Sequence, residues 1–229
     1  MSPLLVLADA NILVKDVVSN VLFDLAAAKL IDLKWTPQIE VEYAQHRARL
    51  WAEAIGRELA FDDFIWAQRR LEPIKQHLVP QHWPPGWQAD GKRLDVLQKS
   101  LFFAPLLKLP DPDDVHVAMA AADWARSARR SVVLATDNLK DLPGADLLPF
   151  DVYPLHPGDV LDLVDLMDAD GLSKSLQKTC TDFKNPEFAL SDMLASIGSV
   201  QQFDNEPLAA KLQACWGLQV SAGSVKSKR

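Results

Sequence analysis

The sequence predicts an α/β protein with a parallel sheet that carries helices on both of its faces. Short apolar stretches that end at polar residues alternate with longer stretches whose apolar residues recur at helical spacing. Strands separated by helices can pair in parallel, because each connection crosses over the sheet. The predicted strands cover residues 4–8, 31–35, 106–109, 131–136 and 151–153.

The predicted helices follow from apolar spacing and from capping residues. The first covers residues 17–30, where Val17, Val21 and Leu25 share one face. The second begins after Thr36, a good N-cap, with Pro37 at the first helical position, and extends to about residue 58. Further helices are expected at residues 61–77, 92–102 and 111–126; the last begins with acids at the positive end of its dipole.

The chain divides into a main domain and a helical C-terminal part. We assign residues 1–157 to the main α/β domain and residues 158–222 to a helical segment that packs on it. Helices are predicted there at residues 159–168, 186–197 and 207–218. Residues 223–229 are expected to form a disordered tail.

Composition excludes several classes of protein. The chain has 229 residues, of which 48% are hydrophobic, which is enough for a globular domain with a core. No apolar run approaches the roughly 18–20 residues of a membrane span, so we expect a cytoplasmic protein without a membrane partner. Cys180 and Cys215 do not have the spacing of a zinc site. The net charge of −7 argues against a polyanion binder unless some of the acids bind cations.

Acidic residues gather at the predicted ends of strands and beginnings of helices. In a parallel sheet, ligands bind beyond the carboxyl ends of the strands. The acidic and amide residues there are Asp9, Glu40, Glu42, Asp111, Asp113, Asp114, Asp137, Asn138 and Asp141. Carboxylates are preferred ligands of Mg²⁺ and Mn²⁺, and such ions assist attack on an anionic phosphodiester. The pattern therefore predicts a metal centre for phosphodiester chemistry.

The residues alone leave some assignments open. Glu40 and Glu42 both border the apolar stripe of their helix, so periodicity does not choose between them. Asp111 precedes Pro112 and is a natural N-cap, which leaves Asp114 free to be a ligand. Side chains alternate along a strand, so Asp137 is expected to point away from the side of Thr136 and Asn138.

Four motifs in order resemble those of the PIN-domain nucleases over residues 4–157. They are Asp9-Ala-Asn11, Thr36-Pro-Gln-Ile-Glu-Val-Glu42-Tyr43, Leu109-Pro-Asp-Pro-Asp-Asp114-Val-His-Val-Ala118 and Leu134-Ala-Thr136-Asp-Asn138-Leu-Lys-Asp141-Leu-Pro143. The stretch His156-Pro157-Gly158-Asp159 is similar to one found in a bacterial subgroup, the PIN-type toxins related to virulence-associated protein C toxins. The resemblance implies a PIN-like parallel sheet with a helical C-terminal extension.

The resemblance also implies roles for single residues. Asp9, Glu42 and Asp114 correspond to the core ligands of Mg²⁺ or Mn²⁺. Asn11, Thr136 and Asn138 correspond to residues that orient the site, and Asp141 matches a further catalytic acid. One departure lies at Val115, where the subgroup usually has an arginine that precedes its histidine.

The function implied by the resemblance is metal-dependent cleavage of RNA. A toxin of this kind would have a cognate antitoxin protein as its partner, and a homodimer is a reasonable expectation. The alternative is a degenerate PIN fold that serves as a scaffold or RNA-binding module without catalysis, and DNA cleavage also stays open. A phosphatase with an Asp-x-Asp motif is disfavoured, because the chain has Asp9-Ala-Asn11.

Three further features have both a functional and a structural interpretation. His116 is either a base or a structural histidine of a half-buried helix. The loop with Trp83 and Trp87 either stacks bases or packs against the domain. The arginines at positions 47, 49, 57, 69 and 70 either form a phosphate track or belong to a solvated surface.

Overall fold

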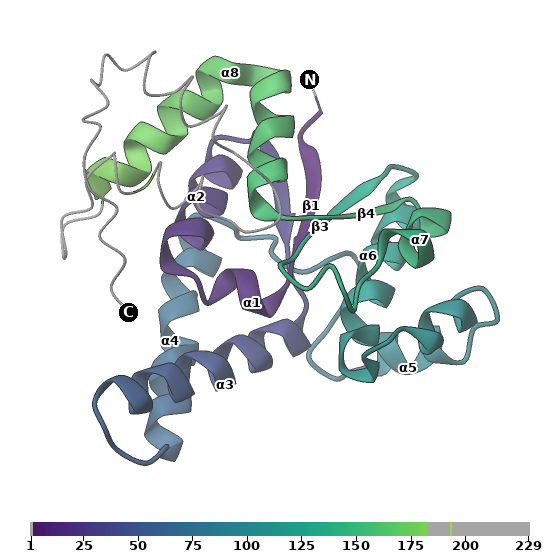
Figure 1. The fold of residues 1–229 in the computed structure, drawn as a ribbon, viewed down its shortest axis with the longest axis horizontal. Helices are drawn as coiled ribbons and strands as arrows, with labels where there is room; N and C mark the ends of the chain where they lie inside the picture. Colours follow the sequence, from purple (N-terminus) through teal and green to yellow (C-terminus); the bar gives the residue numbers. More distant parts are fainter. Residues whose placement is uncertain (1, 183–192, 194–229) are drawn as a thin grey trace.

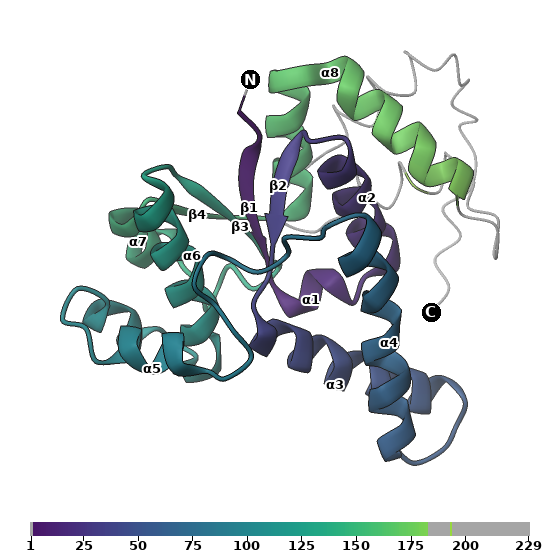
Figure 2. The same cartoon turned by 180° about the vertical axis from the view of Figure 1, so that it is seen from behind.

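A computed structural model describes residues 2–182 and residue 193. It confirms the predicted fold class: a four-stranded, all-parallel sheet flanked by helices, with strand order β2-β1-β3-β4 (Figures 1 and 2). The strands are β1 (Leu4–Ala8), β2 (Ile31–Lys34), β3 (Val132–Ala135) and β4 (Val152–Leu155). The residues that follow the strands therefore share one edge of the sheet.

The helices connect the strands in the predicted alternation. Before β3 the chain forms α1 (Ala10–Leu13), α2 (Asp16–Ala27), α3 (Pro37–Ala54), α4 (Phe61–His77), α5 (Lys92–Gln98), the 3₁₀ helices η1 (Ala104–Lys108) and η2 (Pro112–Asp114), and α6 (Val115–Ala128). After β3 come α7 (Gly144–Leu147), η3 (Leu148–Phe150) and α8 (Pro157–Asp182). The sequence did not predict α1, because four residues are too few to show periodicity.

Helix α3 illustrates how local sequence sets an element. The Thr36 hydroxyl accepts a hydrogen bond from the Ile39 amide at 3.2 Å, and Pro37 occupies the first turn, as predicted. The helix ends before residue 58 because Gly56 adopts a positive φ of 69°. The Arg57 amide then donates to the Ala52 carbonyl at 3.1 Å, which closes a Schellman-type end.

Two predictions in the later part of the chain need correction. Residues 106–109 do not form a strand: η1 covers Ala104–Lys108, with Pro105 in its first turn, where its fixed φ suits a helical turn. The predicted helix 159–168 is only the first half of α8, which kinks at Asp168 (φ −156°, ψ 84°) and continues to Asp182. The helices predicted at 186–197 and 207–218 and the tail 223–229 lie outside the described residues, apart from Met193.

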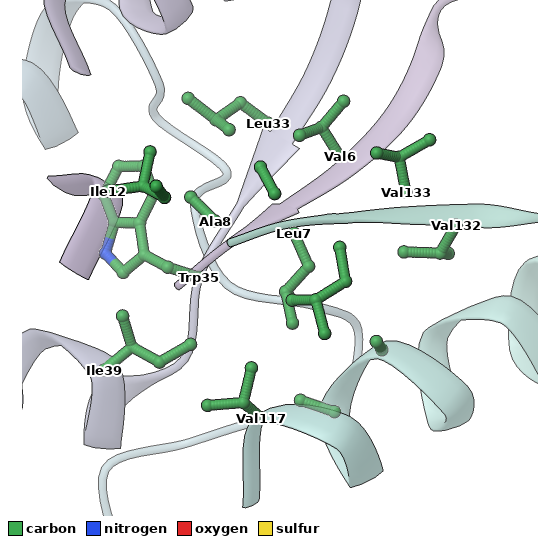
Figure 3. Packing of buried hydrophobic residues seen from close by; sticks show 14 of the residues in the cluster. Val6, Leu7, Ala8, Ile12, Leu33, Trp35, Ile39, Val117, Val132 and Val133 are labelled. Atoms are coloured by element: carbon green, nitrogen blue, oxygen red, sulfur yellow. The ribbon is translucent and has the colours of Figure 1, made fainter. Parts of the chain in front are cut away.

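The core lies between the sheet and the helices that flank it. In Figure 3, Leu7 points from β1 toward Val117 of α6, while Val6 and Leu33 point to the opposite face of the sheet. In α6, residues 115–125 are all buried, which a helix allows when other elements cover it on both sides. Strand β3 contacts one side of α6, and α5 and η1 contact another. The site residues are therefore attached to a rigid, buried frame.

Helix α8 is fastened to α2 by a buried polar contact. Asp24 of α2 is 7% exposed, and its carboxylate accepts hydrogen bonds from the Thr179 hydroxyl and the Lys178 ammonium, both at 2.6 Å. Lys178 also pairs with Asp182, which is exposed. Within residues 2–182, no helix is both long enough and apolar enough to cross a lipid bilayer.

Replacing Asp24 should loosen α8. We expect Asp24→Ala to lower the free energy of unfolding by about 1–3 kcal/mol, because the hydrogen bonds from Lys178 and Thr179 to a buried carboxylate are lost and the Thr179 hydroxyl keeps only the Ser175 carbonyl at 3.1 Å. The matched control Asp182→Ala removes an exposed partner of the same lysine and should cost less than about 1 kcal/mol. Urea unfolding measures both values, and equal costs would contradict the anchoring role of Asp24.

Candidate active site

Most of the predicted site residues line one cleft at the carboxyl edge of the sheet, whereas Thr136 and Asp141 lie outside its wall. The cleft has a volume of about 500 Å³. Its wall includes Asp9 after β1, Glu42 of α3, Asp114 of η2 and Asn138 after β3. Side chains from four separate parts of the chain thus meet in one place.

Asp9 is the most buried acid of the cleft. Its side chain is 5% exposed and caps α1: Oδ1 accepts from the Ala10 amide at 2.6 Å, and Oδ2 accepts from the Thr136 hydroxyl at 2.7 Å. Burial raises the pKa of Asp9, and these two hydrogen bonds only partly offset that rise. Each carboxylate oxygen has a second acceptor position, so Asp9 can still coordinate a cation.

A short hydrogen-bond chain links Asp9 to Asp114. The fully buried Thr136 hydroxyl donates to Asp9 and accepts from the Asn138 amide at 3.0 Å, with the Asn11 side chain at 3.5 Å. The Asn138 side-chain amide then donates to Asp114 Oδ2 at 2.7 Å. The hydrogen bonds of Thr136, Asn138 and Asn11 can therefore orient the carboxylates of Asp9 and Asp114.

Among the acids that line the cleft, Asp114 has the largest shift in pKa. Burial, followed by the negative charges of Asp9, Asp111 and Asp141, raises its pKa to about 6. Asp111 acts as the predicted N-cap, accepting from the Asp113 amide at 2.9 Å. At neutral pH and without a cation, the ionised carboxylates of the cleft therefore repel one another.

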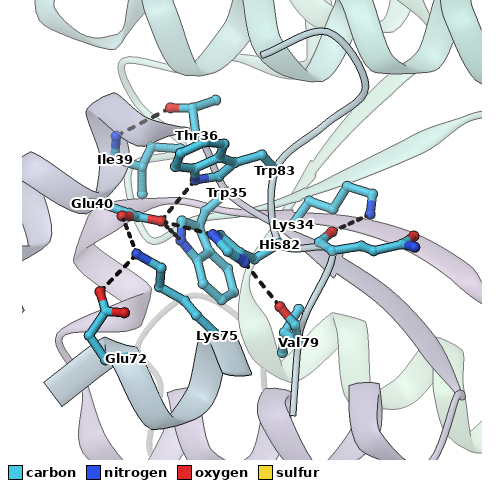
Figure 4. A network of polar contacts seen from close by, with 11 residues as sticks. Lys34, Trp35, Thr36, Ile39, Glu40, Glu72, Lys75, Val79, His82 and Trp83 are labelled. Carbon is cyan, nitrogen blue, oxygen red and sulfur yellow. Dashed lines mark hydrogen bonds and ion pairs between the residues drawn. The ribbon is translucent and has the colours of Figure 1, made fainter. Parts of the chain in front are cut away.

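The structure separates the two glutamates of α3. Glu40 lies away from the cleft, where it accepts from the indole nitrogens of Trp35 at 3.0 Å and Trp83 at 2.8 Å and pairs with Lys75 at 3.1 Å (Figure 4). Glu42 lines the cleft, and its Oε1 lies 3.2 Å from Nε2 of His116. The position of Glu42 agrees with the family motif, while Glu40 belongs to a packing network.

His116 lies beside Glu42 on the wall of the cleft. The imidazole is 4% exposed, and its Nδ1 donates to the Asp113 carbonyl at 2.7 Å, so Nε2 faces Glu42. Burial opposes a charged imidazole, but the hydrogen bond and negative charge of Glu42 outweigh it and raise the pKa of His116. This geometry suits a residue that positions Glu42.

Asp137 points elsewhere, as strand alternation predicts. Its carboxylate pairs with Lys15 and lies 2.7 Å from Nε2 of His156, which follows β4. The Gly158 amide donates to Nδ1 of the same imidazole at 3.1 Å. These contacts fix the loop that carries Asn138 and Asp141 against the beginning of α8.

The tightest group of acids differs from the trio that the motifs select. In the part of the chain that the structure describes, Asp111, Asp114 and Asp141 each offer an oxygen within 4.8 Å of the others. Asp9 and Glu42 line the cleft together with Asp111 and Asp114 but lie outside this group, and Asp141 is not on the cleft wall. The sequence favoured Asp111 as the cap and Asp114 as the ligand, but capping uses one oxygen of Asp111 and leaves the other free. These hard oxygen donors fit Mg²⁺ or Mn²⁺.

The arginines and the tryptophan loop each include residues that make structural contacts within the domain. Arg47 binds Asp16 and the Val14 carbonyl, and Arg57 pairs with Asp63, so the five arginines do not form one phosphate track. Arg49 lines the cleft. In the tryptophan loop, Trp87 is buried and donates to Asp123 at 3.1 Å.

The raised pKa of Asp114 predicts a pH-dependent stability. A carboxyl whose pKa is higher in the folded state binds protons more strongly there, so its contribution falls as pH rises from about 4 to above 6. Without divalent ions, Asp114→Asn should therefore gain stability over the unmodified protein at pH 8, by on the order of 1 kcal/mol, and gain little at pH 4. Thermal melts in EDTA across this range measure the difference, and a constant difference would refute it.

Exchanging each glutamate for glutamine separates their roles. Saturating Mn²⁺ should stabilise the unmodified protein, by about 2.7 kcal/mol at a concentration of 100 Kd. Glu42→Gln should lose most of this increment, whereas Glu40→Gln should keep it but melt lower without metal, because Lys75 loses an ionic partner. Differential scanning fluorimetry with and without Mn²⁺ decides, and loss of the increment only in Glu40→Gln would reverse the assignment.

Comparison with known proteins gives no relative for this chain. No family model, curated protein or solved structure matches it. The likeness to PIN domains therefore rests on the four sequence motifs and on a fold of the expected class.

Proposed function

We propose that this protein is a metal-dependent endoribonuclease of the PIN-domain kind. The observation that carries the proposal is the convergence of Asp9, Glu42 and Asp114 on one cleft, with Asp111 and Asp141 beside them. Burial and mutual repulsion make this arrangement costly in the absence of a cation. A divalent ion is the partner that would make it favourable.

The residues of the chain divide the work of such a site. Asp9, Glu42 and Asp114 would hold Mg²⁺ or Mn²⁺, with Asp141 and Asp111 placed to add oxygen ligands or hold water. A bound divalent ion supplies Lewis-acid chemistry, which orients a water and neutralises charge that grows on the phosphate. Thr136 and Asn138 keep the carboxylates of Asp9 and Asp114 in place, and His116 does the same for Glu42.

The toxin assignment is a finer part of the proposal, and it rests on the resemblance alone. His156-Pro157-Gly158-Asp159 follows β4 and begins α8, as a motif at the end of a PIN-like domain should. A protein of this kind would act on cellular RNA in the cytoplasm, would be blocked by a small antitoxin protein, and would form a homodimer.

The rival proposal is a PIN-like scaffold or RNA-binding module without catalysis. Two observations disfavour it. Asp9, Glu42 and Asp114, the acids of the first three motifs, line a cleft that would repel RNA phosphates unless cations occupied it, and Asp141 of the fourth motif lies close to Asp114. A chain with a net charge of −7 has little reason to bind RNA through an acidic cleft other than through metal ions.

Cleavage of a cellular RNA pool tests the proposal. The purified protein should cut RNA in Mn²⁺ and not in EDTA, and Asp9→Asn and Asp114→Asn should each lower the rate at least about 100-fold, because each removes a charged ligand. Asp146→Asn, an exposed acid on α7, is the control and should cut normally. Folded, inhibitor-free protein that neither cuts RNA nor shows a thermal shift with Mn²⁺ would favour the scaffold.

A further inference from the structure

A second hollow lies on the other side of the beginning of α3 from the acidic cleft. It has a volume of about 530 Å³, within the range of roughly 300–1,000 Å³ typical of small-molecule sites. Gln38 of α3 and Leu94 of α5 line both this hollow and the acidic cleft. A strand whose phosphate lay in the cleft would therefore have this hollow as its next neighbour.

The lining of the hollow combines an aromatic wall with free amides. Trp83 lies along it, held in place because its indole N–H donates to Glu40 at 2.8 Å (Figure 4). The amides come from three elements: Gln38 from α3, Gln68 from α4 and Gln88 from the loop before α5. Among the described residues these amide groups have no hydrogen-bond partner. A ring with donors and acceptors on its edge suits such a lining, because an amide can satisfy both.

The charge of the hollow disfavours a phosphate and admits a neutral group. Its ionisable residues are the carboxylates of Glu40 and Glu72 and the ammonium of Lys75, which gives a net charge of −1. Lys75 lies 3.1 Å from Glu40 and 3.0 Å from Glu72, so its charge is already paired. A nucleobase is flat and uncharged at neutral pH, whereas a phosphate would meet the unbalanced carboxylate.

We infer that this hollow binds a nucleobase of the RNA strand next to the scissile phosphate. The inference rests on the proposed nuclease function and deepens it, because it makes the enzyme selective for a base at one position beside the cut. It also requires a single-stranded substrate at that position, since a base must leave its stack to enter a side pocket. Gln68 and Gln88 are then specificity residues and lie outside the acidic cleft.

Mapping the cut sites in a pool of random 12-nucleotide RNAs tests the inference. The full chain in Mn²⁺ should prefer certain bases at one position beside the cut. Gln68→Ala should flatten that preference and lower kcat/KM for the preferred sequence about 5- to 10-fold, while sequences with a disfavoured base are cut as before. The matched control is Gln76→Ala, an exposed glutamine on the same helix that lines neither hollow.

The outcomes separate the two proposals. Cleavage with the same base profile in Gln68→Ala as in Gln76→Ala overturns the base pocket, leaves the nuclease standing and assigns the hollow to a peptide or to packing. Equal cutting of a fully paired duplex also overturns it. If the unmodified protein cuts no RNA at all, the nuclease fails and the base pocket fails with it. Thermal melts of both variants exclude unfolding, since both side chains are exposed.

Discussion

The parallel register of β1 with β3 is the constraint on which the candidate site depends. Ala8 pairs with Ala135, and the Asp9 amide donates to the Ala135 carbonyl at 3.0 Å. The next residue on each strand is therefore held beside the other, and the Thr136 hydroxyl reaches Asp9. A shift of one residue in this pairing would turn Thr136 away from the acid. The hydrogen-bond chain through Asn138 to Asp114 follows from the same register.

The second requirement is a helix that brings η2 close to the sheet. Helix α6 contains a run of small residues, Ala118 and Ala120–Ala122, which lets it lie near β3. Asp123, in the same buried helix, would be costly without partners. It is held by Arg93, whose Nε lies 2.9 Å from its carboxylate, and by Trp87 at 3.1 Å. These contacts tie the tryptophan loop and α5 to α6.

Most helices and strands could be predicted from the sequence because capping residues and apolar spacing act within a few residues of each element. Thr36 and Pro37 marked the beginning of α3, and residues 61–77 matched α4 at both ends. The prediction for residues 106–109 was wrong because a short apolar run does not distinguish a strand from a 3₁₀ turn, and packing against α6 decided it. The kink at Asp168 has no counterpart in periodicity, so the sequence showed only the first half of α8.

The candidate site was predictable as a set of residues but not as a geometry. Motif order pointed to Asp9, Glu42 and Asp114, and strand alternation placed Asp137 outside. Nothing in the sequence showed that Glu40 is occupied by two indoles and a lysine, because Trp83 and Lys75 lie 43 and 35 residues away along the chain. The close approach of Asp111 to Asp141 is likewise a long-range fact.

The net charge of −7 is compatible with a nuclease when the acids that are paired with basic residues are distinguished from the acids of the cleft. Several basic residues already serve acids: Arg47 holds Asp16, Arg93 holds Asp123 and Lys178 holds Asp24. In the cleft, Glu42 lies beside His116, whereas Asp9 and Asp114 accept hydrogen bonds only from neutral groups among the described residues, and Arg49 is the arginine on the wall. Attraction for a polyanion would then depend on the cations in the cleft, and not on a basic surface. Such a protein would bind RNA strongly only in its metal-loaded state, which couples recognition of the substrate to readiness for catalysis.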